Sequence, residues 1–264
     1  MPFADVNGQH LYYEDTGGAE PPVIFCHGFL LDGSMFEYQV NALENEFRCI
    51  TWDERGFGQT GAATAPFTYW DSADDALALL THLDIEQAFF VGMSQGGFIS
   101  LRAALRAPDR VLGLGLIDTQ AGPENPDVLP AYEGLANEWV TNGPSTELAE
   151  TIASIIMSPG YDHSGWIAKW QAAPKENLAL PFQTLAGRDD VTSRLGEIGC
   201  PAIVFHGEND AAIPMEKAEI LSKELPNCEE LVRVEGAGHA SNLSHPGEVN
   251  RPLRDFLERH SGAR

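Results

Sequence analysis

Residues 89–100, FFVGMSQGGFIS, place a serine hydroxyl where an apolar run gives way to a helical pattern. Glycines lie at positions 92, 96 and 97, around Ser94. A serine on a sharp strand-to-helix turn has an exposed hydroxyl, and small residues on either side prevent clashes between neighbouring segments. The first N–H groups of the following helix point toward the same hydroxyl. The pattern predicts that Ser94 is a nucleophile; the alternative is that it only caps the helix.

A serine nucleophile needs a base, because an alcohol is weakly nucleophilic at neutral pH. His239, in VEGAGHASNLSHP, directly follows the last predicted strand and has small residues on both sides. His245 precedes a proline and fits the start of the final helix. His206 and His27 end apolar strands, where a histidine more often holds a loop by hydrogen bonds. We therefore predict that His239 is the base.

The base in turn needs a carboxylate that fixes its tautomer and stabilises its cation. Asp210, in FHGENDAAIP, follows the penultimate predicted strand. Asp118 ends an earlier strand and is the main alternative, with Asp189 and Asp190 behind it. Asp53, in WDERG, fits a role in its own loop. We predict that Asp210 is the acid.

Acyl transfer also needs N–H donors for the oxyanion, and backbone amides usually supply them. One is expected from Gln95, which follows the nucleophile. The other is expected from the loop CHGFLLDG, where Gly28 lets the backbone turn. Phe29 N–H is the first candidate in this loop and Leu30 N–H the second.

Strands that alternate with helices must position these groups, which predicts a parallel sheet in an α/β domain. Ser34 is expected to cap the first helix, Asp71 or Ser72 to open the second, and Ser145 to cap a later one. The expected strands are HLYYED, PPVIFCHG, FRCITWDE, QAFFVGMS, RVLGLGLID, PAIVFHGEND and EELVRVEG.

The alternation stops between residues 120 and 187, a stretch that carries seven of the prolines. Its clearest element is STELAETIASIIM, which has apolar residues on one helical face. We interpret 120–187 as a helical insertion within one domain whose core comprises 1–119 and 188–264.

Composition limits the classes of function. Lysine and arginine total 16 against 39 acidic residues, a formal net charge of −23, which argues against partners that need a basic surface, such as nucleic acid and anionic membranes. The first residues lack a secretory pattern, and no apolar run is long enough to span a bilayer, so we expect a cytoplasmic protein. The four cysteines, at 26, 49, 200 and 228, have no metal-ligand spacing. We expect neither metal nor cofactor, and the oligomeric state stays open.

The order Ser94, Asp210, His239, with HGF early and VGMSQGG between, resembles the α/β-hydrolase superfamily. The resemblance covers the chain outside 120–187. It implies a mostly parallel, doubly wound eight-stranded sheet, with 120–187 as the cap over the site. HGFLLDGSMFEYQ and DERGFGQTG are similar to small bacterial aryl esterases, many of which are also perhydrolases. GENDAAIP and GAGHASNLSHP resemble the 3-oxoadipate enol-lactonase branch.

The resemblance implies a serine hydrolase that cleaves small neutral or aryl carboxylic esters through an acyl-enzyme. A lactonase is the alternative, and the enol-lactone branch would need a cation in the insertion, where only Lys169, Lys175 and Arg188 at its edge are available. A ligand-binding homologue without activity is a third hypothesis, which the intact set of three residues disfavours. Gln95 stands where relatives often have methionine. The backbone N–H survives that change, a hydrogen bond of the side chain near the site would alter substrate preference, and the role of this side chain stays open.

Overall fold

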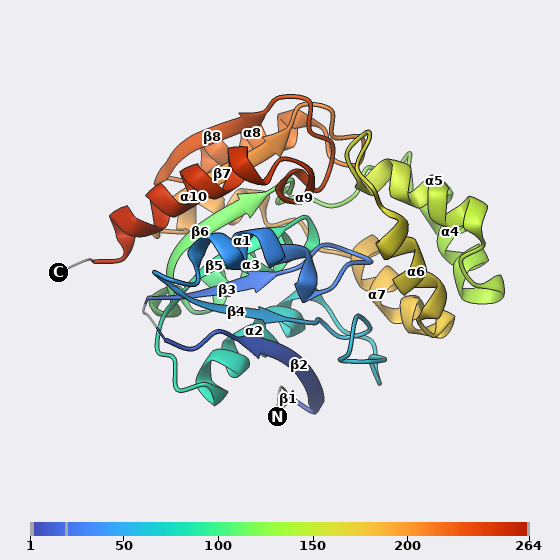
Figure 1. Ribbon diagram of the computed structural model, residues 1–264, viewed down its shortest axis with the longest axis horizontal. Coiled ribbons are helices and arrows are strands. Elements are labelled where there is room, and N and C mark those ends of the chain that lie inside the picture. Colours follow the sequence, from blue (N-terminus) through green and yellow to red (C-terminus); the bar gives the residue numbers. More distant parts are fainter. Residues whose placement is uncertain (1–2, 19–20, 263–264) are drawn as a thin grey trace.

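The strands form a single sheet in the order β1-β2-β4-β3-β5-β6-β7-β8 (Figure 1). The computed structural model describes residues 3–18 and 21–262. β2 is antiparallel to β1 and β4, whereas the strands β4-β3-β5-β6-β7-β8 are all parallel to one another. The predicted mostly parallel eight-stranded sheet is therefore confirmed. Its strands are β1 Phe3–Val6, β2 Gln9–Asp15, β3 Pro22–Cys26, β4 Arg48–Trp52, β5 Ala88–Met93, β6 Val111–Ile117, β7 Ala202–Gly207 and β8 Cys228–Val234.

The central strands are buried on both faces, which explains their continuous apolar runs. All five residues of β3 are buried. Val23 and Phe25 belong to one hydrophobic cluster and Ile24 and Cys26 to another. Side chains of a strand alternate between faces, so these two clusters are the two sides of the sheet.

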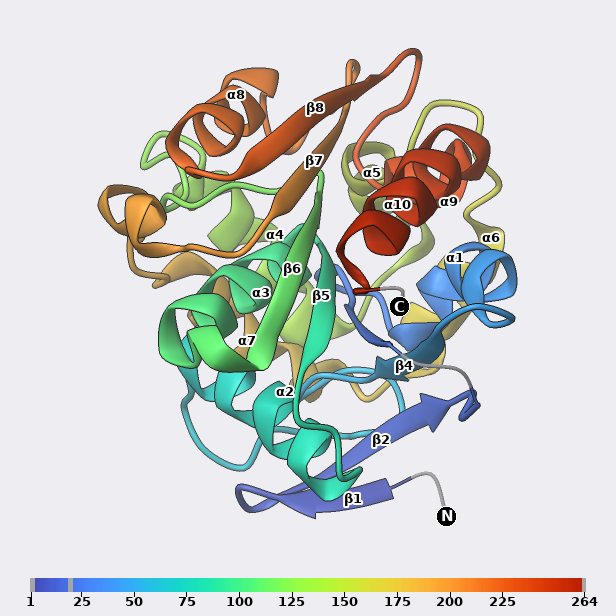
Figure 2. The same ribbon diagram turned by 90° about the vertical axis from the view of Figure 1, so that its left-hand side faces the viewer.

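Helices cover each face of the sheet (Figure 2). Side chains of α2, α3 and α8 pack in the cluster that contains Ile24, and those of α1 and α10 pack in the cluster that contains Val23. The sheet is thus doubly wound, as predicted. These helices are α1 Glu37–Leu43, α2 Tyr69–His82, α3 Gln95–Arg106, α8 Met215–Glu224 and α10 Pro246–His260, with the short α9 Ser241–Ser244 before the last.

Two of the four expected helix starts were wrong, and His245 directly precedes α10 as predicted. α2 begins earlier than predicted: Thr68 accepts from Asp71 N–H, and Asp71 accepts in return from Thr68 N–H, which closes a capping box. Asp32 caps the 3₁₀ turn Gly33–Phe36 that precedes α1, and Ser34 donates to it rather than capping the helix. Ser145 caps α5 as predicted, accepting from the backbone N–H three residues later at 3.2 Å.

Four helices lie between β6 and β7 and stand beyond the carboxyl ends of the parallel strands (Figure 1). Trp139, Ile152 and Trp170 from this segment join the same hydrophobic cluster as Val23 and Phe25. Trp170 also donates its indole N–H to Leu30 O at 2.6 Å. The segment packs directly on the sheet domain; its helices are α4 Leu129–Asn142, α5 Thr146–Ile156, α6 Ser164–Ala172 and α7 Ala179–Ala186.

None of the helices within the described part of the chain has both the length and the apolar character that crossing a membrane requires.

Candidate active site

Ser94 lies on the sharp turn between β5 and α3 with strained backbone angles, φ 51° and ψ −114°. For a residue with a Cβ, positive φ is an uncommon conformation that needs outside support. The end of β6 supplies it: Ser94 N–H donates to Ile117 O at 2.9 Å, and Thr119 Oγ1 donates to Ser94 O at 2.7 Å. The conformation is therefore held by hydrogen bonds of both the N–H and the C=O of Ser94.

The glycines around Ser94 are needed because backbone segments pass very close to them. A Cβ on Gly92 would lie 2.1 Å from Gly96 O, and one on Gly96 would lie 1.8 Å from Cys26 O. A Cβ on Gly97 would lie 2.3 Å from Thr119 Oγ1. Two of these three clashes are with backbone atoms that cannot rotate away. The turn thus depends on glycine at 92 and 96.

His239 and Asp210 lie together, as the sequence suggested. His239 Nδ1 is 2.8 Å from Asp210 Oδ2, and the two side chains are only 4% and 1% exposed. The other carboxylate oxygen of Asp210 accepts from Ala212 N–H and Ile213 N–H, both at 2.8 Å. Because Nδ1 carries the proton toward Asp210, the Nε2 lone pair of His239 is available for another proton.

The charge of Asp210 makes protonation of His239 easier than that of a free imidazole. Burial lowers the pKa of His239, but the charge and hydrogen bond of Asp210 outweigh burial and raise it above its usual value. Burial raises the pKa of Asp210, but the attraction and hydrogen bond of His239 more than offset this and lower it. Asp210 therefore stays ionised while it stabilises the imidazolium.

Asp118, the alternative acid, has no hydrogen bond to His239 and instead joins the two loops that carry His239 and Asp210. One of its oxygens accepts from Gly207 N–H at 2.8 Å and the other from Ser241 N–H at 2.7 Å. It is fully buried and adopts a φ of 47°. The sequence placed it at the correct end of the sheet, but nothing in the sequence signalled this bridging position.

One group of side chains has the composition of a metal site. Ligand atoms of Asp118, His206 and Asp210 lie within 4.8 Å of one another. His206 Nε2, however, donates to Ile213 O at 2.8 Å, and the carboxylates accept from backbone N–H groups and from His239. A cation would have to break these bonds, so we assign the cluster to support of the loops. His206 holds a loop, as predicted.

The expected oxyanion donors come from two elements, the first turn of α3 and the loop after β3. Gln95 begins α3, where an N–H has no intrahelical acceptor. Phe29 and Leu30 both line the cavity at Ser94. Within residues 3–18 and 21–262, neither Phe29 N–H nor Gln95 N–H donates to a protein group.

The side chain of Gln95 points away from the cavity into the core. It is 1% exposed, and its Oε1 accepts from Tyr69 O–H at 3.2 Å. It is absent from the described residues that line the cavity. The side chain of Gln95 therefore makes its hydrogen bond beside α2 and not at the cavity, because α3 turns it toward that helix.

The loop after β4 holds the loop that carries Phe29 in position. Glu54 N–H donates to His27 Nε2 at 2.9 Å, so the other ring nitrogen of His27 is the protonated one, and it donates to Gly28 O at 2.8 Å. Burial lowers the pKa of His27, which keeps the ring neutral. Asp53 accepts from Gly33 N–H at 2.8 Å and from the N–H of Gln59, in its own loop, at 2.8 Å.

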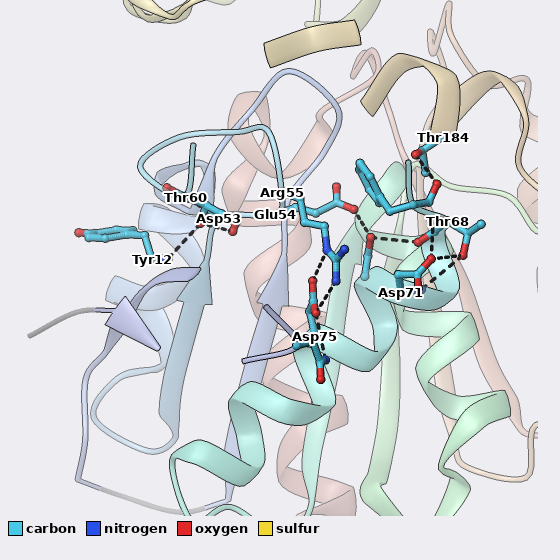
Figure 3. Close-up of polar contacts among 12 residues, drawn as sticks. Tyr12, Asp53, Glu54, Arg55, Thr60, Thr68, Asp71, Asp75 and Thr184 are labelled. Carbon is cyan, nitrogen blue, oxygen red and sulfur yellow. Dashed lines mark hydrogen bonds and ion pairs between the residues drawn. The ribbon is translucent and has the colours of Figure 1, made fainter. Parts of the chain in front are cut away.

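Beneath this loop is a buried acidic residue that sequence reasoning missed (Figure 3). Glu54 is 1% exposed and accepts a short hydrogen bond from Ser72 Oγ. Burial raises its pKa to about 8. The neighbouring Arg55 points to Asp75 instead, and the two form an ion pair at 2.5 Å. The letters DERG do not show that these two adjacent charged side chains point to different partners on α2, Ser72 and Asp75.

Ser94 and His239 line the same cavity, between the sheet domain and the α4–α7 segment. Its volume is about 110 Å³, several times the space that one water needs, and its wall is almost entirely apolar. The other described polar side chains in this wall are Glu124 and Tyr132. The apolar wall consists of Phe29, Leu30, Phe98, Leu135, Ala136, Trp139, Ile152, Ile155, Ile156, Leu178, Phe182, Leu185, Ala212 and Ile213.

The cations expected near the insertion are all bound to other groups. Lys169 pairs with Asp32 at 2.7 Å, and Lys175 donates a short hydrogen bond to Thr141 O. Arg188 pairs with Glu124 at 3.3 Å. Lys169 and Arg188 are thus paired with carboxylates, and none of the three cations lines the cavity.

A family model described as "alpha/beta hydrolase fold" matches residues 21–153 and 142–246. A protein from Synechocystis sp., named provisionally as a non-heme chloroperoxidase, is 30% identical over 98% of this chain and 100% of its own. A thermophilic esterase from Thermogutta terrifontis matches with a TM-score of 0.88 at 29% identity and covers 98% of this chain and 97% of its own. The enol-lactonase of Burkholderia xenovorans LB400 matches with a TM-score of 0.87 at 27% identity, over 97% and 100% of the two chains.

Proposed function

Because the chain belongs to the alpha/beta hydrolase fold family, we propose that it hydrolyses small, uncharged carboxylic esters through an acyl-enzyme on Ser94. The observation that carries the proposal is the hydrogen bond of His239 to Asp210 at the wall of the cavity that Ser94 also lines. A nucleophile, a base and an orienting carboxylate are the groups that acyl transfer requires.

In the proposed reaction, His239 Nε2 takes the proton of Ser94 as Oγ attacks the ester carbonyl carbon. The carbonyl oxygen becomes an oxyanion, which the N–H groups of Phe29 and Gln95 stabilise. Collapse of this intermediate breaks the bond to the alcohol, which leaves with the proton from His239. Water then repeats the sequence on the acyl-enzyme, releasing the acid and restoring Ser94.

Asp210 orients His239 and stabilises its cation in this scheme. The lowered pKa of Asp210, which follows from the attraction of His239 overcoming burial, keeps the carboxylate charged while the imidazole gains and loses a proton. Two backbone N–H groups fix the other oxygen of Asp210, so the carboxylate meets the ring at a constant angle. Such prior orientation is a large part of what a triad contributes.

We propose that residues 120–187 form the cap that selects the substrate. The cavity wall takes α4, α5 and α7 side chains from this segment. Its apolar character favours hydrocarbon or aryl groups. Similarity to an esterase and to an enol-lactonase supports both ester and lactone as substrate classes.

A lactone is the second candidate, since a lactone is a cyclic ester that the same groups would open. An anionic lactone is disfavoured because neither Lys169 nor Lys175 lines the cavity, and Lys169 is paired with Asp32. The proposed preference is therefore for neutral esters and neutral lactones.

The test is active-site labelling with a fluorophosphonate, followed by turnover of p-nitrophenyl butyrate, ethyl butyrate and γ-butyrolactone. We expect one label per chain, located on Ser94 by peptide mass spectrometry, and turnover of at least one neutral substrate. A chain that is neither labelled nor active on any of the three would be a ligand-binding homologue, and the proposed function would be wrong.

A further inference from the structure

Arg188 is a cation buried directly behind the wall of the cavity. Its side chain is 1% exposed. Nε donates to Gly122 O at 3.1 Å and Nη1 donates to Leu185 O at 3.0 Å. The guanidinium also lies over the ring of Phe98, 4.6 Å from its centroid. Phe98 and Leu185 both belong to the cavity wall, so the charge is one side chain away from the substrate space.

Glu124 is the carboxylate that compensates this charge. Its Oε2 lies 3.3 Å from Arg188 Nη2, and its side chain is 14% exposed. Unlike Arg188, Glu124 itself lines the cavity. Its other oxygen accepts from Asn125 N–H at 3.0 Å, which fixes the side chain in the loop between β6 and α4. The cavity therefore meets the negative member of the pair.

A pair of this kind changes what the cavity can bind. A buried cation without a partner would attract an anion strongly, because charges interact more in a less polar medium than in water. With Glu124 in place, the pair is neutral as a whole and its exposed end is negative. A carboxylate on a substrate would face the carboxylate of Glu124, and two like charges in a partly buried site disfavour each other.

We propose that Glu124 is a specificity-determining residue that excludes anionic acyl groups by neutralising Arg188 at the cavity wall. This inference rests on the proposed function, since it concerns which esters the same site accepts. The substrate class is narrowed to esters and lactones whose acyl part carries no carboxylate.

The experiment compares two esters that differ by one methyl group and one charge, dimethyl adipate and monomethyl adipate. Initial rates are followed by titration of released acid for the wild type and for Glu124→Gln, which keeps the shape of the side chain and removes its charge. In the wild type we expect dimethyl adipate to be preferred. In Glu124→Gln we expect the ratio of kcat/KM for monomethyl to dimethyl adipate to rise by about tenfold or more, mainly through a lower KM for the anion.

Two further variants identify the source of the change. Glu133→Gln removes one negative charge from an exposed position of α4 that does not line the cavity, and the ratio should stay at the wild-type value. Glu124→Gln combined with Arg188→Met should lose the gain, because the guanidinium that attracts the anion is gone.

Circular dichroism and thermal unfolding establish that each variant is folded. Should Glu124→Gln not fold, Glu124→Ala, which leaves no polar atom beside Arg188, is measured with the same pair of esters. A folded Glu124 variant whose ratio stays within twofold of the wild type would overturn the inference. Absence of activity on both esters in an unlabelled wild type would instead overturn the proposed function, and the inference with it.

Discussion

The carboxyl edge of the sheet and the α4–α7 segment meet at one cavity but are built differently. At the sheet edge, Ser94, Asp118 and Asp210 are each fixed by at least two hydrogen bonds to or from the backbone. The opposite wall consists of apolar side chains such as Trp139 and Ile156, which touch the cavity without fixed polar partners there. Hydrogen bonds define positions closely, whereas apolar packing tolerates changes of shape. We therefore expect the sheet edge to keep one chemistry while changes in the wall alter which substrate fits.

The largest effect is expected from the nucleophile. Ser94→Ala should reduce kcat for p-nitrophenyl butyrate by about 10⁴-fold or more, because removal of the nucleophile eliminates the covalent route. The measurement is the rate of p-nitrophenolate release, with thermal unfolding as the check that the variant is folded. Activity within about tenfold of the wild type would show that the reaction does not pass through this serine.

Replacement of the acid should come next and should depend on pH. Asp210→Asn is expected to lower kcat by about 10³- to 10⁴-fold, because the amide presents the wrong tautomer to His239. In the wild type, His239 must be neutral to act, and its pKa is raised by Asp210 against the effect of burial. The acid limb of kcat/KM should therefore have its midpoint above pH 6.5 in the wild type, and it should move to lower pH in the variant. An unchanged midpoint would mean that Asp210 does not control the titrating group.

Glu54 allows a test of the sheet edge by stability. Its pKa of about 8 in the folded chain lies above the value of 4.5 for a free glutamate, so the folded state binds more protons than the unfolded state between these two pH values. Stability should fall as pH rises from about 4.5 to 8, by at most about 5 kcal/mol. Glu54→Gln, which cannot ionise, should lose less stability over this range in urea titrations at pH 5 and pH 8. Equal losses in the two proteins would contradict the assignment.

Asp118 separates a positioning role from the role of the acid. Asp118→Asn places an NH₂ group against either Gly207 N–H or Ser241 N–H, so one buried donor loses its acceptor. The expected cost is about 1–3 kcal/mol in the free energy of unfolding. Because the charge of Asp118 also contributes to the raised pKa of His239, the acid limb of the pH profile should move to lower pH, but by less than in Asp210→Asn. If Asp118→Asn shifted the limb more than Asp210→Asn does, Asp118 would be the functional acid.

The smallest effect is expected at the apolar wall. Ile156→Ala should change the preference between p-nitrophenyl acetate and p-nitrophenyl hexanoate by about tenfold in favour of the longer ester, because the removed methyl and methylene groups leave room. The rate of labelling of Ser94 by a fluorophosphonate should change much less. A large loss of labelling would mean that this wall also positions the nucleophile, and the contrast with the sheet edge would not hold.

The sequence was informative where a local pattern has one physical cause. Gly92 and Gly96 are spaced as the backbone contacts around Ser94 require, and β3 is continuously apolar because both of its faces are buried. Patterns of this kind predicted the sheet and predicted that His239 and Asp210 lie at the same edge of it. The site residues themselves stay predictions until the variants are measured.

Features that depend on two distant segments could not be predicted from the sequence. Glu54 and Arg55 are adjacent charged residues, yet one is buried against Ser72 and the other pairs with Asp75. Glu124 reads as a polar residue of a proline-rich loop until its contact with Arg188 is seen. The start of α2 was wrong for a local reason. Asp71 was expected to open the helix, but it is the third helical residue and forms a capping box with Thr68 before the helix.

The double attachment of Asp118 has a consequence for motion. Gly207 N–H belongs to the chain that leads into the acid loop, and Ser241 N–H follows the base. A displacement of one loop pulls on the other through a single carboxylate, so the two loops should fluctuate as one body. We therefore expect the distance between the imidazole of His239 and the carboxylate of Asp210 to stay constant when the α4–α7 segment moves.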